Sequence, residues 1–287
     1  MKSGAPTNST KAPTARRKKK PGTLLIIGGA EDKNGDCLIL KDFAARAQRG
    51  PIVIVTAASQ VASTLYRDYA RIFRRLGLRK VRHLHLEQPE DARDPEVLRL
   101  FDHATGVFFT GGDQLRITTK MGGTDILNRI VEIYKRGGVI AGTSAGASIM
   151  GKTMLVGGEG TESHKVGNWM MAPGLGFAEE VLIDQHFAQR GRIGRLLGAV
   201  ALNPGILGIG IDEDTAIRVE GDLFQVIGRN AVYVVDGRSV SYTNISEASA
   251  EKTMSMHDVT LHILAEGEKF HIHDRRVLST SRETTVR

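Results

Sequence analysis

A chain of 287 residues, of which 41% are hydrophobic and 25% charged, can bury a substantial core and fits one large α/β domain. The formal net charge of +7 does not indicate a nucleic-acid-binding body. Residues 1–20 hold seven Lys and Arg and no acid, which leaves residues 21–287 neutral. The single cysteine, Cys37, excludes an intramolecular disulfide and is typical of a reducing compartment.

Residues 1–21 are predicted to form a disordered basic tail, because Ser, Thr, Pro and Ala surround the run Arg16–Lys20. Electrostatic contact with nucleic acid or an acidic polymer is one interpretation, and a transit peptide is another. We favour a solvated tail, since basic runs are common. The apolar run that follows, Thr23–Ile27, is too short for a signal peptide or a membrane span. We therefore expect a cytoplasmic protein that requires neither nucleic acid nor a membrane.

Short apolar runs alternate with amphipathic stretches through the first half of the chain, which predicts parallel strands joined by crossover helices. The predicted strands are Thr23–Ile27, Ile52–Ala57, Val81–Leu86, Gly106–Thr110 and Val139–Ala141. The predicted helices are Leu38–Gln48, Thr64–Leu76, Pro95–Asp102 and Leu115–Arg136, the last interrupted at Gly122-Gly123. This order is typical of a doubly wound sheet, whose ligands gather at the carboxyl ends of the strands.

The second half contains more strand-like runs separated by turn residues, and we expect them to add antiparallel strands to the sheet edge. They are Ile206–Ile211, Thr215–Val219, Leu223–Ile227 and Ala231–Val235, with a terminal hairpin formed by Leu261–Leu264 and Lys269–His273. The predicted fold is thus α/β: a three-layer, doubly wound, mostly parallel sheet with antiparallel C-terminal additions, like that of flavodoxin or the class I glutamine amidotransferases. One hydrolytic domain spans residues 22–275, and residues 276–287 are predicted to be a frayed tail.

The segment Gly142–Gly146, Gly-Thr-Ser-Ala-Gly, directly follows the last of the parallel strands and predicts a nucleophile elbow. Ser144 stands at the apex of a sharp strand-to-helix turn, which glycine neighbours accommodate. The N–H groups at the start of the following helix favour the negative charge that develops in acyl transfer. No Gly-x-Gly-x-x-Gly follows the first strand and no P-loop occurs, so no nucleotide cofactor is expected. No metal-ligand spacing is found around the elbow either.

A serine nucleophile needs a base and a group that orients it. Of nine histidines, His186 is the predicted base because it ends the apolar run Val181–Ile183 at another strand-to-helix junction. His164 remains an alternative. The orienting carboxylate is expected within Asp212–Asp214, directly after the run that ends at Ile211, and strand alternation does not choose among these three acids.

The order serine, histidine, acid differs from the order serine, acid, histidine of the α/β-hydrolases. A class I glutamine amidotransferase would carry cysteine at the elbow, where this chain has Ser144. Both of these enzyme classes are therefore disfavoured.

The motifs at these strand ends resemble the cyanophycinases, serine peptidases related to aspartyl dipeptidase. The resemblance runs from about Gly22 to Asp236 and rests on Gly142–Ala147, Phe109–Gln114, Asp184–Phe187 with Arg190 and Arg195, and Met171–Gly176. It implies a triad of Ser144, His186 and Glu213, and an oxyanion hole from the backbone N–H groups of Gly112 and Ala145. It also implies an exopeptidase that releases β-Asp-Arg dipeptides from cyanophycin, a poly-aspartate with arginine on each β-carboxyl group.

Such a substrate presents carboxylates and guanidinium groups together. Spacing alone does not decide whether Arg190, Arg192 and Arg195 face the cleft or solvent, and the resemblance favours Arg190 and Arg195 as carboxylate ligands. Further expected substrate contacts are Gln114, Asp184 and Gln185, although Asp184 equally suits a helix cap. The alternatives are an aspartyl dipeptidase and a catalytically silent protein that binds an acidic polymer. The sequence does not fix the oligomeric state, for which we expect a homodimer.

Overall fold

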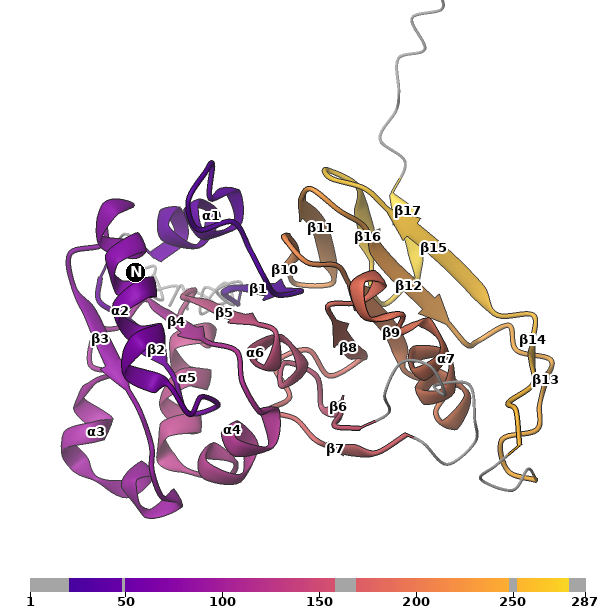
Figure 1. Cartoon of the computed structure of the whole chain (residues 1–287), viewed down its shortest axis with the longest axis horizontal. Helices are drawn as coiled ribbons and strands as arrows, with labels where there is room; N and C mark the ends of the chain where they lie inside the picture. The colour runs from indigo at the N-terminus through magenta and orange to yellow at the C-terminus, as the bar shows by residue number, and fades with distance from the viewer. Residues whose placement is uncertain (1–20, 48–49, 158–168, 248–251, 279–287) are drawn as a thin grey trace, which may run out of the picture.

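The computed structural model describes residues 21–47, 50–157, 169–247 and 252–278. Its largest sheet has nine strands in the order β17-β16-β11-β10-β1-β5-β4-β2-β3. Figure 1 shows the helices of the first half of the chain around β1–β5, with a second sheet and α7 at the other end of the molecule. The predicted α/β fold with antiparallel C-terminal strands is confirmed.

The parallel part of the large sheet is formed by the first five strands. They are β1 (Thr23–Ile27), β2 (Ile52–Val55), β3 (Val81–Leu84), β4 (Gly106–Phe109) and β5 (Val139–Thr143). Every residue of β1, β2, β4 and β5 is buried, as expected when helices cover both faces. Alternate residues of β1 enter different cores, Leu24 on one face and Leu25 on the other.

The helices join these strands and cover the two faces. α1 (Leu38–Ala47) and α2 (Ala62–Arg75) lie over the core that contains Leu25 and Phe108. The other face is covered by α4 (Gln114–Met121) and α5 (Asp125–Lys135), and the short segments η1 (Pro89–Arg93) and α3 (Pro95–Arg99) precede β4. The predicted interruption at Gly122-Gly123 does separate α4 from α5. A short helix, α6 (Ala145–Ser148), follows β5.

The strands predicted in the second half divide between two sheets, which corrects the prediction that all of them extend one edge. The antiparallel extension of the large sheet consists of β10 (Thr215–Glu220), β11 (Leu223–Gly228), β16 (Lys269–His271) and β17 (Arg276–Leu278). The second sheet has the order β15-β12-β9-β8, with bounds Thr260–Leu264, Val232–Asp236, Leu207–Ile211 and Val181–Gln185. β8 and β9 are parallel and connected by α7 (Ile193–Leu202), a crossover unit that gives the second half its own apolar core.

The predicted terminal hairpin is wrong, because β15 pairs with β12 whereas β16 pairs with β11 and β17. The turn between β15 and β16 therefore joins two different sheets. The rings of Phe270 and Phe224 stack with their centroids 5.4 Å apart, which holds β16 on β11. The predicted frayed tail also begins too early, since Arg276–Leu278 form β17. Residues 1–20 and 279–287 lie outside the described residues.

Two small sheets complete the fold, β6 (Thr153–Leu155) with β7 (Met171–Pro173) and β13 (Tyr242–Thr243) with β14 (Met256–His257). The 3₁₀ segment η3 (Ala188–Arg190) lies between β8 and α7. Within the described ranges, each helix is too short or too polar to cross a bilayer.

Candidate active site

Ser144 lies in a strained turn between β5 and α6. Its backbone has φ of 54° and ψ of −113°, a region that side-chain-bearing residues rarely adopt. Gly146 is required by close packing, because a Cβ there would lie 2.6 Å from the carbonyl oxygen of Phe109. These features match the predicted elbow, with the serine side chain presented at the carboxyl end of the sheet.

Three successive carbonyl groups, beginning with that of the last residue of β1, hold the segments that carry the candidate triad. The backbone N–H of Ser144 donates to Ile27 at 3.0 Å, and that of His186 donates to Gly28 at 2.8 Å. The N–H of Asp214 donates to the third carbonyl, that of Gly29, at 2.9 Å. The end of β1 and the loop that follows it therefore fix three segments that are remote in sequence against one another.

The side chains of the three predicted triad residues form a continuous hydrogen-bonded run. Ser144 Oγ lies 2.9 Å from His186 Nε2, and His186 Nδ1 lies 2.6 Å from Glu213 Oε1. These are the distances at which an imidazole takes a proton from a hydroxyl while a carboxylate orients the ring.

The structure distinguishes the three adjacent acids by their partners. The buried carboxylate of Asp212 accepts the N–H groups of Ala188 at 2.9 Å and Ala231 at 3.2 Å. Asp214 accepts the N–H of Asp32 at 2.8 Å. Both flanking aspartates thus hold backbone segments, and only Glu213 of these three acids contacts the imidazole.

The environment of His186 suits a general base. Burial lowers the pKa of His186 below its usual 6.5, opposed by the hydrogen bond and charge of Glu213 and assisted by the nearby charges of Arg190 and Arg192. The ring is therefore neutral at pH 7 and able to accept the Ser144 proton.

The two residues predicted to supply oxyanion-hole donors belong to backbone segments that adjoin Ser144. Ala145 is the first residue of α6, where backbone N–H groups have no acceptor within the helix. Gly112 belongs to the loop after β4, and a Cβ on its neighbour Gly111 would lie 3.3 Å from Ser144 Cβ. Both backbone segments therefore pass close to the nucleophile.

Two of the predicted substrate ligands are engaged with each other. Asp184 is fully buried and accepts hydrogen bonds from Arg195 at both oxygens, with Arg195 Nε 2.6 Å from Oδ2. Since Arg195 is buried as well, this ion pair lies beneath the site surface and fixes α7 to the end of β8.

Sequence reasoning missed the role of Arg192. Its guanidinium donates to the backbone carbonyl of Gln185 at 2.6 Å and to the side-chain carbonyl of Gln185 at 3.1 Å. The Gln185 amide in turn donates to Ser148 Oγ at 3.2 Å, which joins β8 to α6. Burial lowers the pKa of Arg192 to about 10, so the group remains charged at neutral pH. The three-residue spacing of Arg192 and Arg195 was the only sequence signal for this inward-facing pair.

The remaining predicted substrate ligands are Arg190 and Gln114. Arg190 ends η3 and is exposed, and Gln114 begins α4 with its amide donating to the Leu155 carbonyl at 3.0 Å. His164, the alternative base, lies outside the described residues. No cluster of three metal-ligating side chains occurs in the part of the chain that the structure describes.

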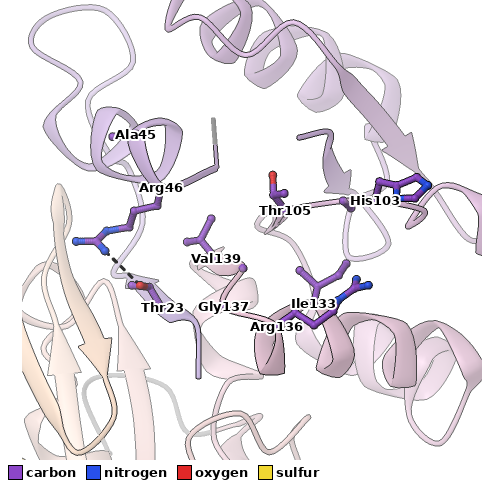
Figure 2. Close-up of a pocket in the computed structure, with 11 residues that line it drawn as sticks. Thr23, Ala45, Arg46, His103, Thr105, Ile133, Arg136, Gly137 and Val139 are labelled. Carbon is purple, nitrogen blue, oxygen red and sulfur yellow. Dashed lines mark hydrogen bonds between the residues drawn. The ribbon is translucent and has the colours of Figure 1, made fainter. Parts of the chain in front are cut away.

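A cavity of about 500 Å³ lies at the opposite end of the sheet and is not part of this site. Thr23 and Val139, the first residues of β1 and β5, line it, whereas Ser144 follows the last residue of β5. Figure 2 shows that Arg46 points to Thr23, to which it donates at 3.2 Å, and not toward Arg136 or His103. The cationic side chains around this cavity therefore do not converge on a common point.

Comparisons with known proteins identify relatives over most of the chain. The family model for Peptidase family S51 matches residues 24–227. Cyanophycinase from Trichormus variabilis is 41% identical over 89% of this chain and 87% of its own length. Cyanophycinase from Geminocystis herdmanii is 38% identical over 86% of this chain and 93% of its own.

A solved structure of a peptidase from an acI-B1 Actinobacterium has a TM-score of 0.65 at 23% identity, covering 88% of this chain and 98% of its own. At that identity the likeness shows a common fold. The family model goes further, because the residues that it matches, 24–227, include Ser144 and His186. The chain belongs to peptidase family S51.

Proposed function

We propose that this S51 peptidase is a cyanophycinase that hydrolyses multi-L-arginyl-poly-L-aspartate as an exopeptidase, releasing β-Asp-Arg dipeptides through an acyl-enzyme. The observation that carries the proposal is the hydrogen-bonded run from Ser144 Oγ through His186 to Glu213. The identity of 41% and 38% to proteins named cyanophycinase supports the choice of substrate.

In the proposed mechanism His186 Nε2 takes the proton of Ser144 as Oγ attacks the backbone carbonyl of an aspartyl residue. The N–H groups of Gly112 and Ala145 stabilise the oxyanion. The imidazolium then gives its proton to the leaving amine, and an acyl-enzyme remains. Water, deprotonated by the same imidazole, attacks the ester and releases the product while Ser144 regains its proton. Glu213 orients His186 and stabilises its charged form in both steps.

In this proposal an exposed cation binds the substrate directly, and a buried ion pair supports the backbone of the site. Arg190 is exposed beside the triad and clamps a carboxylate of the polymer, and Gln114 adds a hydrogen bond from the start of α4. Asp184 and Arg195 act through their buried ion pair, which supports the backbone that leads into His186. The N-terminal tail takes no part, and residues 1–20 are expected to be dispensable for turnover.

The decisive experiment compares the protein with its Ser144→Ala variant on purified cyanophycin. We expect kcat to fall by about 10⁴-fold or more while polymer binding persists. Polymer hydrolysis that survives the substitution would show the catalytic assignment to be wrong. A wild type that binds the polymer without cleaving it would instead favour the silent binding protein.

Assays with small Asp-X dipeptides separate cyanophycinase from the alternative, aspartyl dipeptidase, which would prefer them to the polymer. A cytoplasmic location and a homodimer stay predictions, as does independence of metal, cofactor, nucleic acid and membrane. Gel filtration with light scattering tests the dimer, and turnover after dialysis against a chelator tests independence of metal.

A further inference from the structure

A buried carboxylate that takes no part in the triad lies directly behind the elbow. Glu31, in the loop after β1, is only 3% exposed. Its Oε2 accepts a hydrogen bond from Thr143 Oγ1 at 2.6 Å, and its Oε1 accepts one from the Tyr69 hydroxyl. Thr143 is the last residue of β5 and immediately precedes Ser144. Among the residues that the structure describes, the nearest cation is the partly exposed ammonium of Lys33, 3.8 Å from Oε1.

This arrangement is costly, because a carboxylate loses its hydration on burial. Two hydroxyl donors offset part of that cost. Burial and the neighbouring charge of Glu31 raise the pKa of Tyr69 well above 10, so the tyrosine remains a proton-bearing donor. Apolar side chains would fill the same volume without the desolvation cost, so the carboxylate points to a role in geometry rather than in stability alone.

The feature that Glu31 can influence is the strained backbone of Ser144. A positive φ at a serine is costly and persists only where the surroundings hold it. One restraint is the hydrogen bond from the Ser144 N–H to Ile27. The other is the side chain of Thr143, which Glu31 ties to the same loop whose carbonyls hold the His186 segment.

We infer that Glu31 is a positioning residue: by holding the Thr143 hydroxyl, it keeps the strained Ser144 backbone where Oγ stays aligned with His186 Nε2. The inference rests on the proposed serine peptidase function and deepens it. Loss of the Glu31–Thr143 link misaligns the nucleophile without altering the substrate ligands, so it lowers kcat and leaves KM nearly unchanged.

The test compares three single variants of the full-length protein. Thr143→Val removes the hydroxyl at nearly constant volume, and Thr143→Ser keeps it. Tyr69→Phe removes the other donor to Glu31, which costs a similar buried hydrogen bond but leaves the link to the elbow intact. For each variant we would measure kcat and KM on cyanophycin, the rate of Ser144 labelling by a fluorophosphonate, and the unfolding temperature.

The expected result is a kcat and a labelling rate at least about tenfold lower for Thr143→Val, with near-wild-type values for Thr143→Ser and Tyr69→Phe. If Thr143→Val is labelled as fast as wild type, the inference is overturned, and the same holds if Tyr69→Phe loses as much rate as Thr143→Val. A folded wild type that is not labelled at Ser144 overturns the proposed function and this inference with it.

Discussion

Gly29 packs so closely against His186 that a Cβ at residue 29 would lie 2.3 Å from Cε1 of the imidazole. The same glycine has φ of 105°, and its carbonyl accepts the N–H of Asp214 next to Glu213. One residue in the first loop of the fold therefore limits where the ring can lie and anchors the segment that orients it.

We predict that Gly29→Ala lowers kcat by about 100-fold, because the added methyl displaces the ring by an ångström or more from Ser144 Oγ. Gly77→Ala is a matched control: Gly77 has φ of 95°, and a Cβ there would meet nothing within 4 Å. The control should cost about 1 kcal/mol of stability and leave kcat unchanged. Equal kcat values for the two variants would contradict this prediction, which steady-state kinetics and denaturant titration test.

The lowered pKa of His186 predicts the acid side of the pH–rate profile. The neutral imidazole is the active form, so kcat/KM should decline as the pH falls through an apparent pKa below 6.5. Burial also lowers the pKa of His83, which lies outside the triad, so His83→Gln should leave the profile unshifted. An acid limb with a midpoint above 6.5 would count against His186 as a desolvated base.

The same lowered pKa affects stability. Between the folded-state pKa and 6.5 the unfolded chain binds a proton at residue 186 that the folded chain does not, so the free energy of unfolding falls as the pH falls through this window. Replacing His186 with Gln should remove this contribution. Denaturant titrations of both proteins across the window test the difference, and parallel curves would contradict it.

Glu213 and Asp212 should respond differently to removal of their charge. Glu213→Gln is expected to lower kcat by about 10³- to 10⁴-fold with little change in fold, because the amide disfavours the required imidazole tautomer. It should also move the acid limb to lower pH, since Glu213 raises the pKa of His186. Asp212→Asn should cost about 1 kcal/mol of stability through its two backbone partners. Reversed effects in kinetics and unfolding would mean that the wrong acid was assigned.

Arg195 is expected to contribute to stability, whereas Arg190 is expected to contribute to substrate binding. Arg195→Met leaves Asp184 buried without its principal partner and should lower the free energy of unfolding by about 3 kcal/mol or more. Arg190→Met removes an exposed cation and should raise KM for the polymer about tenfold with little effect on unfolding. Measuring KM for the polymer and the free energy of unfolding on both variants tests whether the two arginines have different roles. A large KM effect of Arg195→Met in a fully folded protein would instead make Arg195 a direct ligand.

The sequence by itself determined the elements that position the nucleophile. β1 and β5 are buried on both faces, so they read as continuous apolar runs and were predicted nearly to their observed ends. The elbow is also predictable from the sequence, because its glycines and its serine are neighbours in the chain. His186 followed from the same pattern of an apolar run that ends in polar residues.

Tertiary structure decided which remote groups meet. Asp212, Glu213 and Asp214 are indistinguishable by composition and spacing, and only their separate partners assign Glu213 to the imidazole. The same holds for the pairing of β15 and β16 with different sheets and for the burial of Arg195 on Asp184. Hydrophobic periodicity records which side of an element is buried, but not which distant element covers it, because that choice depends on packing and hydrogen bonds formed across the whole fold.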